Sequence, residues 1–309
     1  MTRLVRLGLC VAAVACSRAD LDAVTGTPVD GGAGGGAGGA PAVICPSPAL
    51  APGDRMETVP VGGTSRSYLL HVPAAYDGSK PVSLVLDFSG LAVTGAQQRA
   101  QSNFPDETDP EGVVMAFPTG SDGPLGNGWN VGPCCVSGNV DDVAFARALV
   151  AEVRATACID PKRIYATGFA VGGGMANYLA CEAADLFAAV APAAFDLMEE
   201  NVADCQPARP ITVISFRGTN DMLVPYDGGL SPVVPGMPVT FLGAQATFKK
   251  WAQLDHCTGS PSASDANGCA TYASCQGGVE VVLCTKTGGG TEQANAGVAW
   301  PVLKRHPLP

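Results

Sequence analysis

The sequence predicts a single α/β domain with a mostly parallel central sheet and helices on both of its faces. Short apolar runs typical of buried strands, such as VSLVLDF at 82–88, alternate along the chain with longer segments of helical spacing. Parallel strands need crossover helices, which then cover both faces of the sheet. The chain has 309 residues, 47% of them hydrophobic, and this is enough for one large core.

The expected elements alternate in chain order. The strands are expected at 67–72, 82–88, 112–117, 163–167, 188–192, 211–216 and 279–284, and the helices at 140–156, 173–181 and 244–254. Asp141 and Asp142 near the start of the first of these helices suit the positive end of a helix dipole.

The N-terminal region has the pattern of an export signal followed by a tether. Arg3 and Arg6 precede an apolar run too short to span a membrane, so we interpret residues 1–15 as a signal peptide. Residues 16–44 are rich in Gly and Ala and predict a flexible tether, and the folded domain is expected over 45–309. Cys16 follows Ala13-Val14-Ala15 and resembles the lipidated first residue of a bacterial lipoprotein; the alternative is a free thiol near the cleavage point. We therefore expect a secreted or outer-surface protein that touches the membrane only through a lipid anchor.

Charge and cysteine content narrow the classes of partner. The formal net charge is −10 with 18 Lys and Arg, which leaves no basic surface for a nucleic acid. The cysteines beyond the signal form an even set that suits disulfides in an oxidising compartment: Cys45, Cys134, Cys135, Cys158, Cys181, Cys205, Cys257, Cys269, Cys275 and Cys284. A metal site is the rival interpretation of a cysteine cluster, but export and the lack of clean C-x-x-C pairs argue against it. We expect no metal and no cofactor.

A glycine-rich turn between a strand and a helix is the most informative motif. The segment Gly168-Phe169-Ala170-Val171-Gly172 has the layout of a nucleophile elbow, G-x-S-x-G, with alanine in place of the serine. The two flanking glycines are what such a tight turn requires sterically.

Several segments in order resemble one family. They are similar to segments of the secreted α/β-hydrolases that include polyhydroxybutyrate depolymerases and feruloyl or acetylxylan esterases. The segments are RSYLLHVPAAYDG, GNGWNVGPCCVSGNVDDVAFARALV, CIDPKRIYATGF, FAAVAPAA, FRGTNDMLVPYDGG and AWP. The resemblance covers roughly residues 58–301 and implies an α/β-hydrolase fold and serine hydrolase chemistry, in which a Ser attacks an ester, a His takes its proton and an Asp orients the His.

The resemblance implies that this catalytic triad is degraded. The nucleophile position is Ala170, which has no hydroxyl, and the base position, in a G-H-x-W-P segment of the family, is Val298. The acid position is retained as Asp221. The chain has three histidines, His71, His256 and His306, and all of them are expected to be structural or solvated.

The resemblance also implies the surroundings of the cleft. Ser89 and Gly90 stand where the family has His-Gly in the loop that donates to the oxyanion, and Val171 follows the nucleophile position. The resemblance places Trp129 with Asn130, and also Trp300, in segments that border the cleft, where the indole rings could stack on sugar or phenolic rings. The alternative is that these tryptophans pack in the core or at its rim.

The family also suggests disulfide partners. Cys181 is expected to pair with Cys205, Cys158 with one of Cys134 and Cys135, and Cys45 with the other. The pairing among Cys257, Cys269, Cys275 and Cys284 stays open.

The functional expectation is an exported esterase homologue that is catalytically impaired and acts by binding a carbohydrate, phenolic ester or polyester. The alternative is an active carboxylic ester hydrolase that uses other catalytic groups.

Overall fold

A nine-stranded sheet forms the centre of the folded part of the chain. The computed structural model describes residues 43–136, 138, 140–231, 234 and 236–309. The strands are β1 (Gly53–Val61), β2 (Thr64–Val72), β3 (Val82–Phe88), β4 (Val114–Pro118), β7 (Ile159–Phe169), β8 (Ala189–Ala193), β9 (Thr212–Gly218), β12 (Cys269–Tyr272) and β13 (Val281–Lys286). Their order across the sheet is β1-β2-β4-β3-β7-β8-β9-β13-β12.

The middle of the sheet is parallel and its edges are antiparallel. Strands β4, β3, β7, β8, β9 and β13 pair in parallel, whereas β1, β2 and β12 pair with antiparallel neighbours. Every residue of β3, β4, β8 and β9 is buried, as expected for strands covered on both faces. The predicted α/β-hydrolase architecture, with a mostly parallel sheet, is confirmed.

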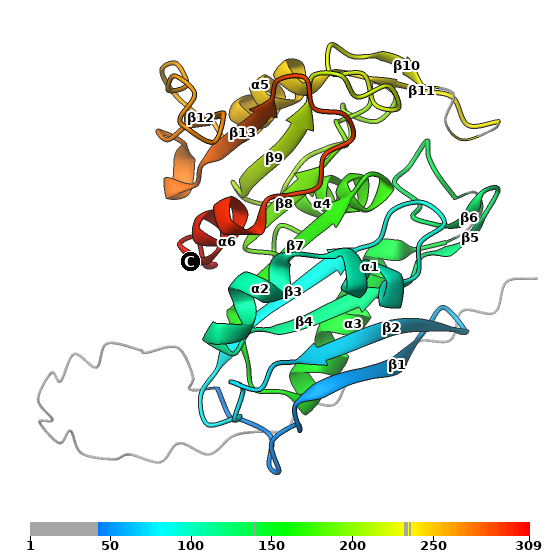
Figure 1. Ribbon diagram of the computed structural model, residues 1–309, viewed down its shortest axis with the longest axis vertical. Coiled ribbons are helices and arrows are strands. Elements are labelled where there is room, and N and C mark those ends of the chain that lie inside the picture. The colour runs from blue at the N-terminus through cyan, green and yellow to red at the C-terminus, as the bar shows by residue number, and fades with distance from the viewer. Residues whose placement is uncertain (1–42, 137, 139, 232–233, 235) are drawn as a thin grey trace, which may run out of the picture. The chain divides into compact units, whose positions relative to one another are not determined.

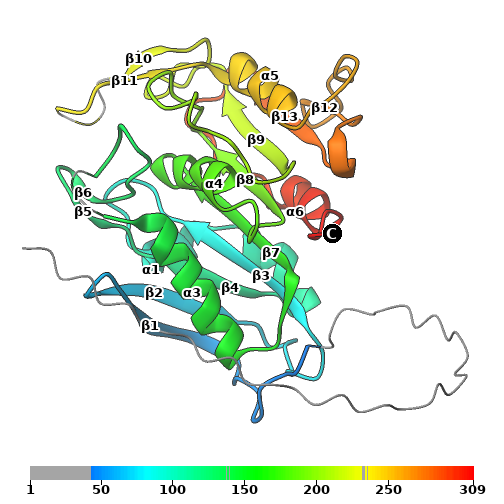
Figure 2. The ribbon, with the colours of Figure 1, turned by 180° about the vertical axis from the view of Figure 1, so that it is seen from behind.

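Helices cover both faces of this sheet. α1 (Gly95–Gln101), α2 (Phe104–Thr108) and α6 (Ala296–Lys304) lie on the face toward the viewer in Figure 1. α3 (Asp142–Thr156), α4 (Val171–Glu182) and α5 (Ala244–Leu254) lie on the other face, seen in Figure 2. Each layer buries its own apolar cluster against the sheet. Two short hairpins, β5 (Ser121–Gly123) with β6 (Gly126–Gly128) and β10 (Gly229–Ser231) with β11 (Val239–Phe241), and the one-turn helices η1 (Asp109–Glu111) and η2 (Gln276–Gly278) complete the described elements.

The acidic start of α3 has two separate uses. Asp141 is the N-cap, and its carboxylate accepts from the Ala144 backbone N–H at 2.7 Å. Asp142 is buried and pairs with Arg66 at 2.7 Å while accepting from the Asn130 N–H. The sequence predicted the start of this helix. It did not predict the buried ion pair, because Arg66 belongs to β2, which is distant from Asp142 in the sequence.

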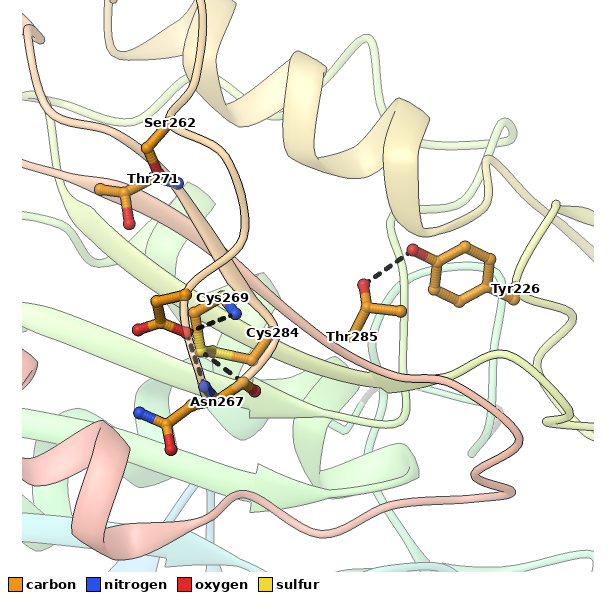
Figure 3. The surroundings of a disulfide bond; sticks show 8 residues. Tyr226, Ser262, Asn267, Cys269, Thr271, Cys284 and Thr285 are labelled. Carbon is orange, nitrogen blue, oxygen red and sulfur yellow. Dashed lines mark hydrogen bonds between the residues drawn. A yellow bond between two sulfur atoms is a disulfide. The ribbon is translucent and has the colours of Figure 1, made fainter.

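Five disulfides join the ten described cysteines, and the expected pairing is partly wrong. Cys181–Cys205 is confirmed. Cys158 pairs with Cys45, and Cys134 pairs with its neighbour Cys135. The family-based expectation for Cys158 is wrong because Cys45 lies beside Cys158, at the start of β7, and forms the disulfide with it. Cys134 and Cys135 are then left to pair with each other. The remaining pairs are Cys257–Cys275 and Cys269–Cys284, the second of which joins the facing positions of β12 and β13 (Figure 3).

The expected signal peptide at 1–15 and Cys16 lie outside the described residues, as does nearly all of the expected tether at 16–44.

Candidate functional site

The glycine-rich motif forms a sharp turn between β7 and α4. Ala170 stands at the apex with φ 51° and ψ −119°, a conformation that is costly for any residue with a side chain. The Ala170 N–H donates to the Ala193 carbonyl oxygen at the end of β8 (3.0 Å), and its own carbonyl accepts from the Gly174 N–H (3.0 Å). The strand, turn and helix that the motif predicts are therefore present, with a methyl group at the apex.

Two glycines allow this turn to approach the sheet. A Cβ on Gly168 would lie 2.3 Å from the Gly172 carbonyl oxygen, and one on Gly172 would lie 2.0 Å from the Phe88 carbonyl oxygen at the end of β3. Both contacts are with backbone atoms, which cannot rotate away. The two positions thus admit only glycine without a shift of the backbone.

An apolar cavity of about 320 Å³ opens at the apex of the turn. Its described lining consists of Gly90, Leu91, Val93, Cys134, Cys135, Phe169, Ala170, Val171, Ala194, Phe195, Leu223, Val224, Ser231, Val234, Met237, Val239, Phe241 and Thr291. No charged side chain belongs to this described lining. The hydroxyl of Ser231 already donates to the Leu223 carbonyl oxygen at 2.6 Å, which leaves Thr291 as the other polar side chain of the set. The cavity therefore suits a neutral, mostly apolar group.

Asp221 lies just after β9 and connects to this cavity through Thr291. Its Oδ1 accepts from the backbone N–H groups of Leu223 (2.9 Å) and Val224 (3.0 Å) and from the Thr291 hydroxyl (3.2 Å). Its Oδ2 is buried and has no partner among the described residues. A buried carboxylate oxygen without a donor is energetically unfavourable, so this site is one donor short of satisfaction.

A buried ion pair holds the loop that carries Asp221. The Arg217 guanidinium at the end of β9 pairs with the Asp196 carboxylate and also donates to the Val224 carbonyl oxygen at 2.6 Å. Because the Val224 N–H in turn donates to Asp221, the pair links β9, the loop after β8 and the Asp221 turn. Sequence reasoning did not identify Arg217 or Asp196, since neither belongs to a recognisable motif.

The structure does not bring Val298 to this site. Val298 lies on α6 and lines a separate depression with Phe216 and Lys286. Among the described residues of the lining, Thr291, in the loop between β13 and α6, is the one whose side chain hydrogen-bonds Asp221. The sequence feature that points to Thr291 is the preceding run Gly288-Gly289-Gly290, which comes just after a strand. Loops at the carboxyl ends of parallel strands commonly carry functional residues.

The loop after β3 lines the cavity with Gly90, Leu91 and Val93, and Ser89 is not part of the described lining. Gly90 lines the cavity, and a Cβ there would lie 3.9 Å from the Ala170 Cβ. Ser89 is fully buried outside the described lining, and its hydroxyl has no hydrogen-bond partner among the described residues. Ser89 therefore does not offer a nucleophile to the cavity.

Both expected cleft tryptophans are in the core instead. Trp129 is fully buried, donates from its indole N–H to the Ser89 carbonyl oxygen (2.8 Å) and packs edge-to-face on Phe88. Trp300 packs edge-to-face on Tyr165, on the α6 side of the sheet. The Asn130 backbone N–H donates to the Asp142 carboxylate at the start of α3, and its side-chain amide donates to the Val140 carbonyl oxygen. Because the two indole groups are packed in the core and Asn130 is held by these hydrogen bonds, none of the three belongs to the described lining of the cavity.

The three histidines lie away from the described cavity lining. His71 lies between the carboxylates of Asp54 and Asp109. His306 lies 3.4 Å from Glu280, and His256 follows α5. Within the described part of the chain, no group of three His, Cys, Asp or Glu is arranged to hold a metal ion, and no helix is long and apolar enough to cross a membrane.

No protein-family model matches the chain. Feruloyl esterase B of Piromyces equi is 43% identical over 247 residues, which are 79% of this chain and 46% of that protein. Feruloyl esterase C of Emericella nidulans is 34% identical over 168 residues, which are 54% of this chain and 58% of that protein. The chain thus spans about half the length of these relatives.

Solved structures with little sequence identity share the fold. Acetyl xylan esterase from Aspergillus awamori superposes with a TM-score of 0.59 at 15% identity and covers 81% of this chain and 99% of its own. The S-formylglutathione hydrolase from Agrobacterium tumefaciens has a TM-score of 0.52 at 12% identity, over 77% of this chain and 87% of its own. The strand order, the turn at Ala170 and the solved structures show that the described domain has the α/β-hydrolase fold, and its sequence is similar to those of feruloyl esterases.

Proposed function

We propose that the described domain binds a neutral acyl ester in the cavity at Ala170 and does not hydrolyse it efficiently. The observation that carries the proposal is a methyl group at the apex of an otherwise intact catalytic turn, facing an apolar cavity. Related proteins are named feruloyl and acetyl xylan esterases, which supports an ester of a phenolic acid or of a carbohydrate as the ligand class.

Ala170 and Thr291 occupy the nucleophile and base positions in this proposal. A methyl group cannot attack a carbonyl, and a threonine hydroxyl cannot take up a proton at neutral pH as an imidazole does. Asp221 keeps the acid position, and its partnerless Oδ2 supports the loss of an imidazole N–H that once satisfied it. In well-studied serine hydrolases, loss of the nucleophile or the base alone lowers turnover about a millionfold.

In this proposal the groups that bind the ester, the backbone N–H donors and the apolar cavity, are retained. Val171 is the first residue of α4, where backbone N–H groups have no intrahelical acceptor, and it lines the cavity, as Gly90 does. Donors of this kind hold a carbonyl oxygen of an ester as well as an oxyanion. The described lining has no charge, so the acyl group that it accepts is neutral.

Export and anchoring also belong to the proposal. The basic and apolar start of the chain, the five disulfides and Cys16 support a secreted or surface protein, held by a lipid on Cys16. Metabolic labelling with a radioactive fatty acid tests this part, because a Cys16→Ser variant should lose all label.

The function is tested by measuring binding and turnover on the same protein. The purified protein should bind methyl ferulate in a calorimetric titration, resist labelling by a fluorophosphonate, and hydrolyse p-nitrophenyl butyrate no faster than a heat-denatured sample. Val93→Trp should abolish binding by filling the cavity, whereas Val298→Trp, another partly buried valine outside the cavity, should not.

Stoichiometric labelling of a serine, with ester hydrolysis that the label removes, would contradict the proposal. The chain would then be an active carboxylic ester hydrolase with other catalytic groups, the alternative favoured by the activity in its relatives' names.

A further inference from the structure

One wall of the cavity is a disulfide between adjacent residues. Cys134 and Cys135 both line the cavity, in the loop between β6 and α3. Their backbone is held in place, because Cys134 accepts from the Val131 N–H (2.6 Å) and the Cys135 N–H donates to the Trp129 carbonyl oxygen (2.9 Å). Among the five disulfides of the described residues, this pair alone lines the cavity at Ala170.

Stabilisation of the fold does not explain this disulfide. A cross-link stabilises mainly by shortening the loops that the unfolded chain can explore, and the effect grows with the number of residues enclosed. Cys45–Cys158 separates its partners by 113 positions, whereas Cys134–Cys135 separates them by 1 and encloses no loop. Its effect must therefore be local, on the shape and chemistry of the cavity wall.

The rest of the wall is suited to an aromatic guest. Phe169, Phe195 and Phe241 line the same cavity, and the last two pack edge-to-face with ring centroids 4.9 Å apart. Divalent sulfur is polarisable and makes favourable contacts with aromatic rings, typically at the ring edge. An aliphatic chain gains the burial of apolar surface in such a cavity but gains none of the sulfur–ring interaction.

We propose that the Cys134–Cys135 disulfide is a specificity-determining wall that contacts the aromatic ring of the ligand and selects it over a saturated group of the same size. This inference rests on the proposed binding function and adds the contact that discriminates between ligands.

The test compares two esters that differ only in their ring. Methyl 3-phenylpropanoate and methyl 3-cyclohexylpropanoate are titrated calorimetrically into the wild-type chain and the Cys134→Ala/Cys135→Ala variant. The variant should lose about 3- to 10-fold in affinity for the phenyl ester, the size expected of sulfur–ring contacts, and less than about 2-fold for the cyclohexyl ester. The matched control, Cys257→Ala/Cys275→Ala, removes a disulfide outside the cavity lining and should leave the ratio of the two affinities unchanged.

A second measurement on the wild-type chain covers the case in which the variant fails to fold. The ring protons of bound methyl 3-phenylpropanoate should show nuclear Overhauser contacts to the β-protons of Cys134 and Cys135. Equal losses for both esters, or ring contacts only to the Val234 and Met237 side of the cavity, would overturn the inference and leave the binding function intact. Failure of both esters to bind the wild-type chain would overturn both.

Discussion

At the scale of single residues, we propose that the site keeps the supports of a triad without its reacting atoms. Asp221 is held by two backbone N–H groups and Thr291, and Ala170 is held in a conformation that alanine does not adopt by preference. This strain is retained although the methyl group gains no chemistry from it. In the proposed function, a serine at position 170 and a histidine at position 291 would use this same arrangement.

Restoring both side chains at once should restore hydrolysis. Ala170→Ser/Thr291→His places a hydroxyl at the apex and an imidazole beside the Asp221 carboxylate, whose Oδ1 accepts from Thr291 and whose Oδ2 has no partner among the described residues. We expect p-nitrophenyl butyrate hydrolysis at least about 100-fold above either single variant, because the residues of a triad act as a unit. Steady-state kinetics on variants with unchanged thermal melting measures this gain.

The control for this prediction is Ala170→Ser/Val298→His, which tests the position expected from the sequence resemblance. It should remain at the level of Ala170→Ser, since Val298 lies outside the cavity lining. Adding Asp221→Asn to the active pair should lower its activity at least tenfold. If the Val298→His pair were the active one, the assignment of Thr291 to the base position would fail.

At the scale of elements, the turn between β7 and α4 is possible because glycines remove side chains at the points of closest approach. The end of β3 lies directly against Gly172, and Gly173 has the same relation to β8, where a Cβ would lie 2.2 Å from the Ala193 carbonyl oxygen. The first turn of α4 is thus wedged between two strand ends. The first N–H groups of this turn have no intrahelical acceptor, and Val171 at this end of α4 lines the cavity.

Gly172→Ala should therefore destabilise the fold strongly. The added methyl group would meet the Phe88 carbonyl oxygen, and we expect a loss of about 2–3 kcal/mol or more in the free energy of unfolding. Urea denaturation measures it. Gly290→Ala is the matched control, because nothing lies within 4 Å of its added Cβ, and its effect should stay within about 0.5 kcal/mol. Equal effects of the two variants would show that the turn has room to relax.

At the scale of the whole molecule, buried carboxylates make stability depend on pH. Asp255, at the end of α5, is fully buried; its Oδ1 accepts from the Ile211 N–H (2.9 Å), and its Oδ2 has no partner among the described residues. Burial raises the pKa of Asp255 from 3.8 to about 7, against the lowering effects of that hydrogen bond and of Arg209. Between these two values the folded chain keeps a proton that the unfolded chain releases.

This difference should make the contribution of Asp255 to stability fall as the pH rises. The contribution is complete below the unfolded pKa of about 4, is lost up to about pH 7, and stays constant above that. Asp255→Asn should flatten the dependence of the free energy of unfolding on pH in this window, measured by urea denaturation at several pH values. Asp106→Asn, at an exposed carboxylate, is the control and should leave the slope unchanged. An unaltered slope in Asp255→Asn would mean that the carboxylate is ionised in the folded chain.

Much of the fold follows from local pattern. The strands at 82–88 and 211–216 and the helix at 244–254 were predictable because burial on both faces or on one stripe leaves a period in the sequence. β1 was missed because it is an exposed edge strand with Pro60 and little apolar alternation, and α6 was missed because the GVAWP segment contains a proline.

The sequence by itself determined what the apex of the turn cannot do, since the absence of a hydroxyl at Ala170 is a property of the side chain and not of its surroundings. Only the tertiary structure decided which residues surround the cavity at this apex. Thr291 reaches Asp221, Cys134 pairs with Cys135 beside the cavity, and Trp129 fills the core, because the packing of loops from distant strands sets these distances. Local periodicity reports whether a residue is buried, and it carries no information about which residue lies on the other side of the contact.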